Sequence, residues 1–192
     1  MKPIILIGGG GHCISCIDVI EMTKEFSILG IIDSSKKKGT KILDYEVIGD
    51  DNDIEILSKT CKNFLITIGQ IKSHLIRQEI YFKLKKLNLK LPIIISPLSH
   101  VSKYANIKEG TIVMHDAIIN AGAKLGKCNI INSKSLIEHE VLVGDFCHIS
   151  TSSTVNGQTV IEDNCFIGSN SVLVNNIKIK KNSIIPAGKR IG

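Results

Sequence analysis

Two histidines, His139 and His148, lie nine residues apart in the segment IEHEVLVGDFCHIS. His139 is flanked by Glu138 and Glu140, and a neighbouring carboxylate can fix the tautomer of an imidazole and raise its basicity. This grouping suits a general base that works near neutral pH. The alternative is that both histidines are incidental surface residues of a repeating scaffold.

A second group with chemical potential is the glycine loop in PIILIGGGGH, between a predicted strand and a helix predicted from about Cys13 to Lys24. Such a loop lets the backbone approach a phosphate, whose charge the helix N-terminus favours. Gly8 and Gly10 match part of the dinucleotide fingerprint, but Cys13 occupies its third glycine position. Asp33, about twenty residues on, would suit a ribose hydroxyl. A structural turn, a nucleotide-sugar site and a dinucleotide site all remain open.

The six cysteines are irregularly spaced, which argues against a disulfide framework and favours reduced thiols. Cys13 and Cys16 form the only pair with metal or redox spacing. They have no second pair to complete a zinc site, so packing is the favoured interpretation.

Composition excludes several classes of function. The 192 residues carry a net charge of +6, but the only arginines are Arg77 and Arg190, and there is no Trp. Nucleic-acid recognition is therefore not expected. The basic run Lys36–Lys38 is interpreted as a solvated loop. No segment has the apolar length of a signal peptide or membrane span, so a cytoplasmic protein is expected.

The second half of the sequence is a six-residue repeat. Every sixth residue from Val101 to Ile185 is Val, Ile or Leu, and the position four residues later is usually small. This pattern is typical of a β-helix in which each hexad forms one short strand and a turn. If three hexads make a coil, Cys147 and Cys165 stack inside the core, which rejects Cys147 as a nucleophile.

The same count separates the two histidines by half a coil. They should therefore lie on opposite sides of the prism within one chain. If both serve one reaction, a neighbouring subunit must bring them together, which predicts a symmetric oligomer with sites at its interfaces. Three prisms around a threefold axis would meet this requirement.

The first half alternates apolar runs with helical patterns. A second strand in FSILGIID, a third over Phe64–Ile68 and a helix around Ser73–Leu87 predict a short parallel α/β sheet. The predicted organisation is therefore an α/β, Rossmann-like domain over residues 1–98 and a β-helix domain over 99–192.

The motifs GGGGH, IISPLSHVS, INSKSLIEHE and GDFCHIS together resemble the bacterial sugar acyltransferases of the sialic-acid O-acetyltransferase and nucleotide-4-amino-sugar N-acetyltransferase family. The resemblance covers nearly the whole chain. It implies a left-handed parallel β-helix, a homotrimer and the use of acetyl-CoA. It implies no metal: His115, His139 and His148 lack the histidine spacing of hexapeptide-repeat carbonic anhydrases.

The resemblance also implies residue roles. His139 matches the catalytic base, Glu140 its orienting partner, and His148 a residue that contacts the acetyl group or the acceptor. Asn132 matches a residue near the acceptor amine, and the Gly157 amide matches the donor that stabilises the thioester oxygen. The matching pantetheine groove comprises Gly168, Ser169, Ala187 and Gly188. The matching nucleotide-sugar pocket comprises Gly8, Gly10, Gly11, His12, Asp33, Ser34, Gly69 and Gln70.

The resulting hypothesis is transfer of an acetyl group from acetyl-CoA to the 4-amino group of a nucleotide-linked sugar, with UDP as the expected nucleotide. One alternative is O-acetylation of sialic acid. Another, from a different class, is a non-catalytic trimeric solenoid that acts as a binding module. The dinucleotide-dependent oxidoreductase is rejected because its fingerprint is broken and no second substrate domain is evident.

Overall fold

The computed structural model describes residues 1–192, which form two compact units. The first unit comprises Met1–Gly69 and Leu75–Pro92, and the second comprises Gln70–His74 and Ile93–Gly192. The chain crosses into the second unit earlier than the expected boundary at residue 98. The reason is that strand β6 (Ile94–Ile95) already pairs with β9 (Ile112–Val113) of the β-helix.

The first unit is a five-stranded sheet with helices, in the strand order β3-β4-β2-β1-β5. Its elements are β1 (Lys2–Ile7), α1 (Gly11–Thr23), β2 (Phe26–Ile32), β3 (Lys41–Ile42), β4 (Tyr45–Gly49), α2 (Ile54–Leu57), β5 (Phe64–Ile66) and α3 (Leu75–Lys86). Strands β1, β2, β4 and β5 are parallel, but β3 pairs antiparallel with β4. The expectation of a wholly parallel sheet is therefore wrong at this edge, where residues 41–49 form a hairpin.

The central strand β1 places its glycine loop at the carboxyl edge of this sheet. Residues Ile4–Ile7 are buried because β1 has a parallel neighbour on each side. Helix α1 follows at once, beginning at Gly11 rather than near Cys13. It ends where Lys24 adopts a left-handed conformation (φ 55°) and donates its N–H to the Glu21 carbonyl. The glycine loop thus leads directly into the helix N-terminus.

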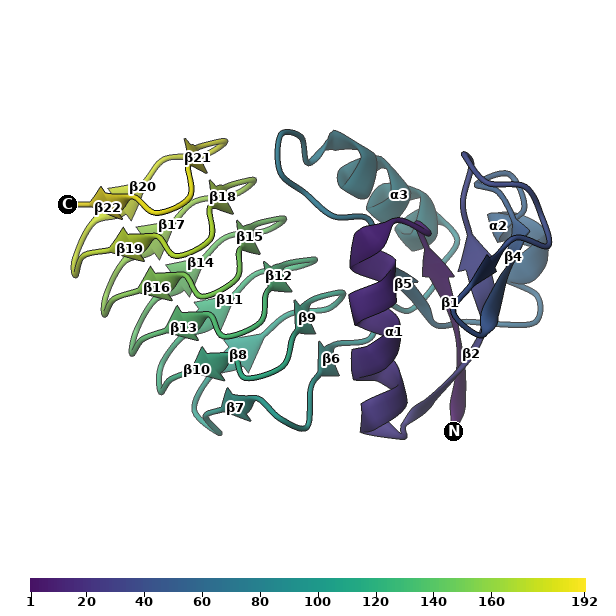
Figure 1. Ribbon diagram of the computed structural model, residues 1–192, viewed down its shortest axis with the longest axis horizontal. Helices are drawn as coiled ribbons and strands as arrows, with labels where there is room; N and C mark the ends of the chain where they lie inside the picture. Colours follow the sequence, from purple (N-terminus) through teal and green to yellow (C-terminus); the bar gives the residue numbers. More distant parts are fainter. The chain divides into compact units, whose positions relative to one another are not determined.

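The second unit is a parallel β-helix of the left-handed hexapeptide type, built from three sheets (Figure 1). The first sheet contains β7 (His100–Val101), β10 (Ile118–Ile119), β13 (Leu136–Ile137), β16 (Thr154–Val155), β19 (Val172–Leu173) and β22 (Arg190–Ile191). The second contains β8 (Asn106–Ile107), β11 (Lys124–Leu125), β14 (Leu142–Val143), β17 (Val160–Ile161) and β20 (Lys178–Ile179). The third contains β6, β9, β12 (Ile130–Ile131), β15 (His148–Ile149), β18 (Phe166–Ile167) and β21 (Ile184–Ile185).

The predicted repeat register is confirmed. Each aliphatic hexad residue is the second residue of a two-residue strand and pairs with its counterpart eighteen residues away, as Ile137 does with Val155. These residues form one continuous core along the prism. Cys147 and Cys165 lie fully buried in that core, one coil apart.

From Gly110 onward, each turn between strands contains a residue in the left-handed conformation, and these residues form three columns along the corners of the prism. The corner between the first and second sheets holds Gly122, Glu140, Gln158 and Asn176. Each member donates its backbone N–H to a carbonyl of the preceding coil, as Gln158 does to the His139 carbonyl (3.0 Å). This column is called the dyad corner below, after the pair His139 and Glu140 that lies at it.

The stacked core leads to a stability prediction. Ile131→Ala removes a fully buried side chain and is expected to cost about 2 to 5 kcal/mol of unfolding free energy, because the packed coils cannot close the cavity. The matched control Ile118→Ala removes an outward-facing side chain that is 40% exposed, and should cost about 1 kcal/mol or less. Urea unfolding of both variants checks this, and equal losses would contradict the core assignment.

Candidate active site

His139 lies in the turn between β13 and β14, at the dyad corner. Its Nδ1 is 3.3 Å from Glu140 Oε2, and the two side chains are 55% and 61% exposed. A carboxylate only accepts hydrogen bonds, so Nδ1 carries the proton and Nε2 presents its lone pair. No group of the chain is bonded to that Nε2.

The two carboxylates beside His139 have different partners. Glu138 accepts hydrogen bonds from the Asn120 side chain (3.0 Å) and from the His139 backbone N–H (3.3 Å), so it supports the turn. Glu140 faces the imidazole instead. It also accepts a hydrogen bond from Gln158 Nε2 (3.0 Å), a contact that the sequence analysis missed. The eighteen-residue spacing of Glu140 and Gln158 is the signal that could have found it.

Gly157 is one coil after His139, directly against its ring. A methyl group at Gly157 would lie 2.6 Å from His139 Cε1 and Nε2. The imidazole therefore packs on a position that has room only for glycine. The Gly157 N–H makes no hydrogen bond within the chain, so it is available to a ligand oxygen beside the base.

His148 is only 7% exposed and is held on both ring nitrogens. Its Nδ1 donates to the Gln70 carbonyl (2.6 Å), and its Nε2 accepts from the Asn132 side chain (3.1 Å). The side-chain amide of Asn132 therefore points its nitrogen toward His148, and its Oδ1 accepts a hydrogen bond from the Ser133 N–H (2.9 Å). This network suits a neutral imidazole that positions its neighbours rather than one that removes a proton.

One chain does not bring the two histidines together. His139 lies at the corner between the first and second sheets, whereas His148 opens β15 in the third sheet. The third sheet is the face opposite that corner in a three-sided prism.

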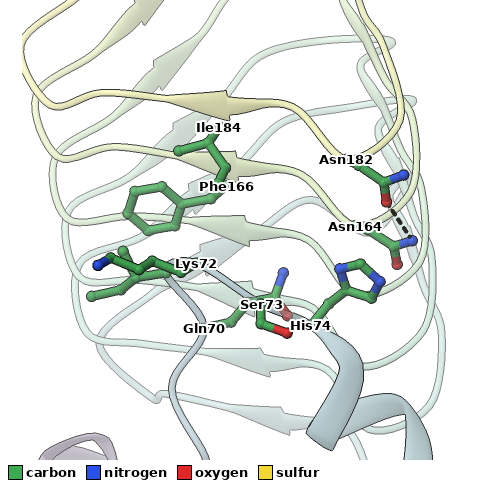
Figure 2. A pocket seen from close by; sticks show the side chains of 9 residues that line it. Gln70, Lys72, Ser73, His74, Asn164, Phe166, Asn182 and Ile184 are labelled. Carbon is green, nitrogen blue, oxygen red and sulfur yellow. Dashed lines mark hydrogen bonds between the residues drawn. The ribbon is translucent and has the colours of Figure 1, made fainter.

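A small cavity of about 80 Å³ lies on the third sheet, under the segment Gln70–His74 (Figure 2). Phe166 and Ile184 line it from neighbouring strands, and Asn164 donates to Asn182 (3.0 Å) at its other side. The Phe166 ring meets the His148 ring edge-on, with centroids 5.2 Å apart. His148 does not line the cavity itself, but Gln70, whose carbonyl accepts from His148, does.

Gln70 and Gly69, both expected in the nucleotide-sugar pocket, lie in different units. Gly69 is beside His12, whose Cβ is 3.5 Å from where a Gly69 side chain would begin. Gln70 packs on the β-helix, where its Nε2 donates to the Phe146 carbonyl (2.7 Å). Its buried Oε1 has no hydrogen-bond partner. Gln70 therefore positions His148, a role the sequence did not indicate.

The residues expected to line the pantetheine groove lie at a third corner, in the turns after β18 and β21. Gly168 packs directly against the next coil, because an added methyl group would meet the Ala187 backbone nitrogen at 2.4 Å. The Ser169 hydroxyl bonds that of Ser150 (2.9 Å). Ala187 and Gly188 are exposed, and Gly188 has open space beside it. This corner thus offers exposed backbone rather than side-chain chemistry.

The glycine loop of the first unit is tied to Asp33. The Gly9 N–H donates to Asp33 Oδ2 (2.7 Å), and Gly10 and Gly11 have no atom within 4 Å of an added methyl group. Gly8 is different, because φ is +104° and Ile68 packs directly against it. The open side of the loop is therefore at Gly10 and Gly11, where α1 begins without a side-chain cap.

Ser35 holds the Asp33 side chain, because its hydroxyl and N–H donate to Asp33 Oδ1 (2.6 and 2.8 Å). Ser34, expected in the nucleotide-sugar pocket, is exposed beside it. Partial burial raises the pKa of Asp33, but the hydrogen bonds from Ser35 and Gly9 outweigh this, with help from Lys36, and the net shift is downward. Lys36 lies in an exposed loop, as the sequence indicated, and its side chain runs beside Gly9.

All six cysteines are free and buried. Burial raises the pKa of Cys13 to about 11 and raises that of Cys16 further. A hydrogen bond to the Cys165 thiol, together with burial, raises the pKa of Cys147. The raised pKa values of Cys13, Cys16 and Cys147 disfavour the thiolate that a nucleophile needs, whereas the hydrogen bond with Cys147 lowers the pKa of Cys165, which lies fully buried in the core.

Nowhere in residues 1–192 do three or more His, Cys, Asp or Glu side chains form a group that could hold a metal ion. The helices of the structure are too short or too polar to cross a membrane.

Two family models match the chain. The PglD N-terminal domain matches residues 3–84, and the bacterial transferase hexapeptide (six repeats) matches residues 158–192. The acetyltransferase domain of PglB from Neisseria gonorrhoeae FA1090, solved in complex with acetyl coenzyme A, is 25% identical with a TM-score of 0.88. That alignment covers 97% of this chain and 89% of the other.

Two further solved structures share the fold at lower identity. WeeI from Acinetobacter baumannii AYE is 19% identical with a TM-score of 0.78, over 100% of this chain and 97% of the other. PerB from Caulobacter crescentus, in complex with CoA and GDP-perosamine, is 21% identical with a TM-score of 0.70, over 97% of this chain and 92% of the other.

The fold and the dyad corner define a two-domain protein with a hexapeptide-repeat β-helix. The chain carries a match to the PglD N-terminal domain followed by a match to the hexapeptide repeats of bacterial transferases, and its fold is similar to that of the PglB acetyltransferase domain.

The hydrogen bonds that Asp33 accepts from Gly9 and Ser35 predict that the stability of the protein depends on pH. The pKa of Asp33 is lowered in the folded state, so its hydrogen bonds stabilise the protein above the unfolded pKa of about 3.9. This contribution is lost as the pH falls through the folded pKa. Asp33→Asn should therefore lose stability relative to wild type at pH 7, and the difference should shrink below about pH 4.

Urea unfolding at pH 7 and in the acidic range measures this difference. Asp44→Asn is the control, because Asp44 is an exposed residue outside the glycine loop and its replacement should cost little at either pH. A difference for Asp33→Asn that is equal at both pH values would contradict the anchoring role.

Proposed function

We propose that this protein transfers an acetyl group from acetyl-CoA to the 4-amino group of a nucleotide-linked amino-deoxy sugar, with His139 as general base. The observation that carries the proposal is the dyad corner, where the unpartnered His139 Nε2 lies against the Gly157 backbone and Glu140 faces Nδ1. An imidazole base beside a free backbone N–H is what acyl transfer to an amine requires.

The chemistry of the dyad corner is direct transfer. As the sugar amine attacks the thioester carbonyl, His139 Nε2 takes its proton and the Glu140 carboxylate stabilises the resulting imidazolium. The Gly157 N–H donates to the developing oxyanion. The carbon–sulfur bond then breaks, and the CoA thiolate leaves and can take the proton from His139. No covalent enzyme intermediate is needed, in keeping with the buried cysteines.

The likeness to proteins with known ligands supports the two substrates. The PglB domain binds acetyl coenzyme A, and PerB binds CoA and GDP-perosamine. In this chain the exposed backbone at Ala187 and Gly188 fits a pantetheine chain. The open loop at Gly10 and Gly11, next to the α1 N-terminus, fits a sugar nucleotide diphosphate, and Asp33 is the expected partner of the ribose. UDP is the proposed nucleotide.

A homotrimer completes the proposal. His139 and His148 lie on different sides of one prism, so a site that uses both must combine two subunits. Under this arrangement the His148 network of one subunit, with Asn132, contacts the acceptor or the acetyl group beside the dyad corner of its neighbour. Because the reaction draws on acetyl-CoA, the cytoplasm remains the proposed location.

The first test is thiol release from acetyl-CoA with UDP-, GDP- and dTDP-linked 4-amino sugars, beside free sialic acid. One amino sugar should be turned over, and His139→Ala should lower kcat about 100-fold or more, because a positioned base is lost. Turnover of sialic acid alone would indicate O-acetylation instead. If a folded trimer turns over no acceptor and fails to bind acetyl-CoA, the non-catalytic binding module replaces the proposal.

A second test uses the close packing at the dyad corner. Gly157→Ala places a methyl group where the His139 ring lies, and the ring is the part that can yield, so the fold should survive while the base is displaced. This displacement of the His139 ring is expected to lower kcat about 10- to 100-fold. Asn175→Ala, at the equivalent position one coil later, is the control. Wild-type kcat in Gly157→Ala would contradict the assignment of His139.

A further inference from the structure

Gln158 contacts the carboxylate that faces the candidate base. Its Nε2 donates to Glu140 Oε2 at 3.0 Å, and this is the same oxygen that lies 3.3 Å from His139 Nδ1. A single carboxylate oxygen therefore accepts from the imidazole of its own coil and from the amide of the next. The three side chains form one connected set.

The coils on both sides of Glu140 define where its side chain lies. On the preceding coil stands Gly122, and a methyl group there would come within 3.2 Å of Glu140 Cγ, so the stem passes over a glycine. On the following coil stands Gln158. Because Glu140 is 61% exposed, burial alone does not select its rotamer, and the Gln158 amide is the contact that holds its far end.

The backbone at residue 158 does not by itself select glutamine. The φ angle there is +61°, in the left-handed region that asparagine adopts more readily than most non-glycine residues. Equivalent left-handed corners hold asparagine at Asn164, Asn170, Asn176 and Asn182, and other residues at Cys128, Lys134, Phe146 and Ser152. Glutamine is one methylene longer than asparagine, and its amide reaches the Glu140 carboxylate of the preceding coil.

We propose that Gln158 is a positioning residue, which holds the Glu140 carboxylate against His139 Nδ1 and so keeps the His139 Nε2 lone pair directed at the acceptor. This inference rests on the proposed function for its kinetic consequence, but not for its structural one. Gln158 itself touches neither substrate in this role. The length of the Gln158 side chain matters because its amide must span one coil to reach the Glu140 carboxylate.

The kinetic test compares two replacements. Gln158→Leu removes the donor at similar length, and Gln158→Asn keeps an amide that is too short to reach Glu140. Both should lower kcat about tenfold, the effect of one hydrogen bond, with KM for acetyl-CoA and acceptor within about twofold of wild type. Gln158→Asn should unfold at the same or a higher temperature than wild type, because asparagine suits the left-handed corner.

Asn176→Leu is the matched control, because it changes an exposed left-handed residue of the same corner one coil further on. It should leave kcat unchanged. A purely structural role for Gln158 would give the opposite pattern, in which Gln158→Asn keeps wild-type kcat.

A spectroscopic test works even if no acceptor is turned over. Nitrogen-15 NMR of the histidine rings should find His139 mainly as the Nδ1–H tautomer in wild type. In Glu140→Gln and in Gln158→Leu the population should move toward the Nε2–H form, and in Asn176→Leu it should not. Unchanged tautomers in Gln158→Leu would overturn the positioning role. A shift of tautomer in a protein without transferase activity would support the positioning role and reject the proposed function.

Discussion

The backbone hydrogen bond from a left-handed corner residue to the preceding coil, present at every corner from Gly122 to Gly188, is the constraint on which the rest of the second unit depends. Glu140 donates to the Ala121 carbonyl (3.1 Å) and Gln158 to the His139 carbonyl (3.0 Å), so each of these turns is fixed by the turn before it. A side chain at a corner consequently has its neighbours eighteen residues before and after it, and His139 has its position set by Gln158 through the backbone.

The dyad corner is where long polar side chains meet across coils. Asparagine recurs at the corners of the later coils, whereas the middle coils carry other residues at every corner, among them Cys128, Lys134, Phe146 and Ser152. At the dyad corner the middle coils carry Glu140 and Gln158, whose side chains reach between coils. The preceding coil carries Gly122, which leaves room for the stem of Glu140. The candidate site therefore depends on the side chains at three successive positions of one corner.

Much of the architecture could be predicted from the sequence because the hexad pattern is long and every strand obeys it. The register of the β-helix and the inward position of Cys147 followed from counting alone. The hairpin over residues 41–49 did not, because β3 is only two residues long and its pairing depends on tertiary contacts. The histidines and their flanking acids were visible in the sequence. The contact of Gln70 with His148 gave no sequence signal, because it joins residues 78 apart that belong to no common repeat, whereas the contact of Gln158 with Glu140 follows the eighteen-residue coil.

The two histidines have different hydrogen-bond environments. At His139 a carboxylate faces Nδ1 and nothing binds Nε2, so the Nε2 lone pair is open. At His148 a carbonyl accepts from Nδ1 and an amide donates to Nε2, so adding a proton at Nε2 requires the Asn132 contact to be given up. Under the proposed function, the proton that leaves the acceptor amine is therefore taken by His139 rather than by His148. The contacts of His148 suit the task of holding Asn132 and the loop at Gln70 in place.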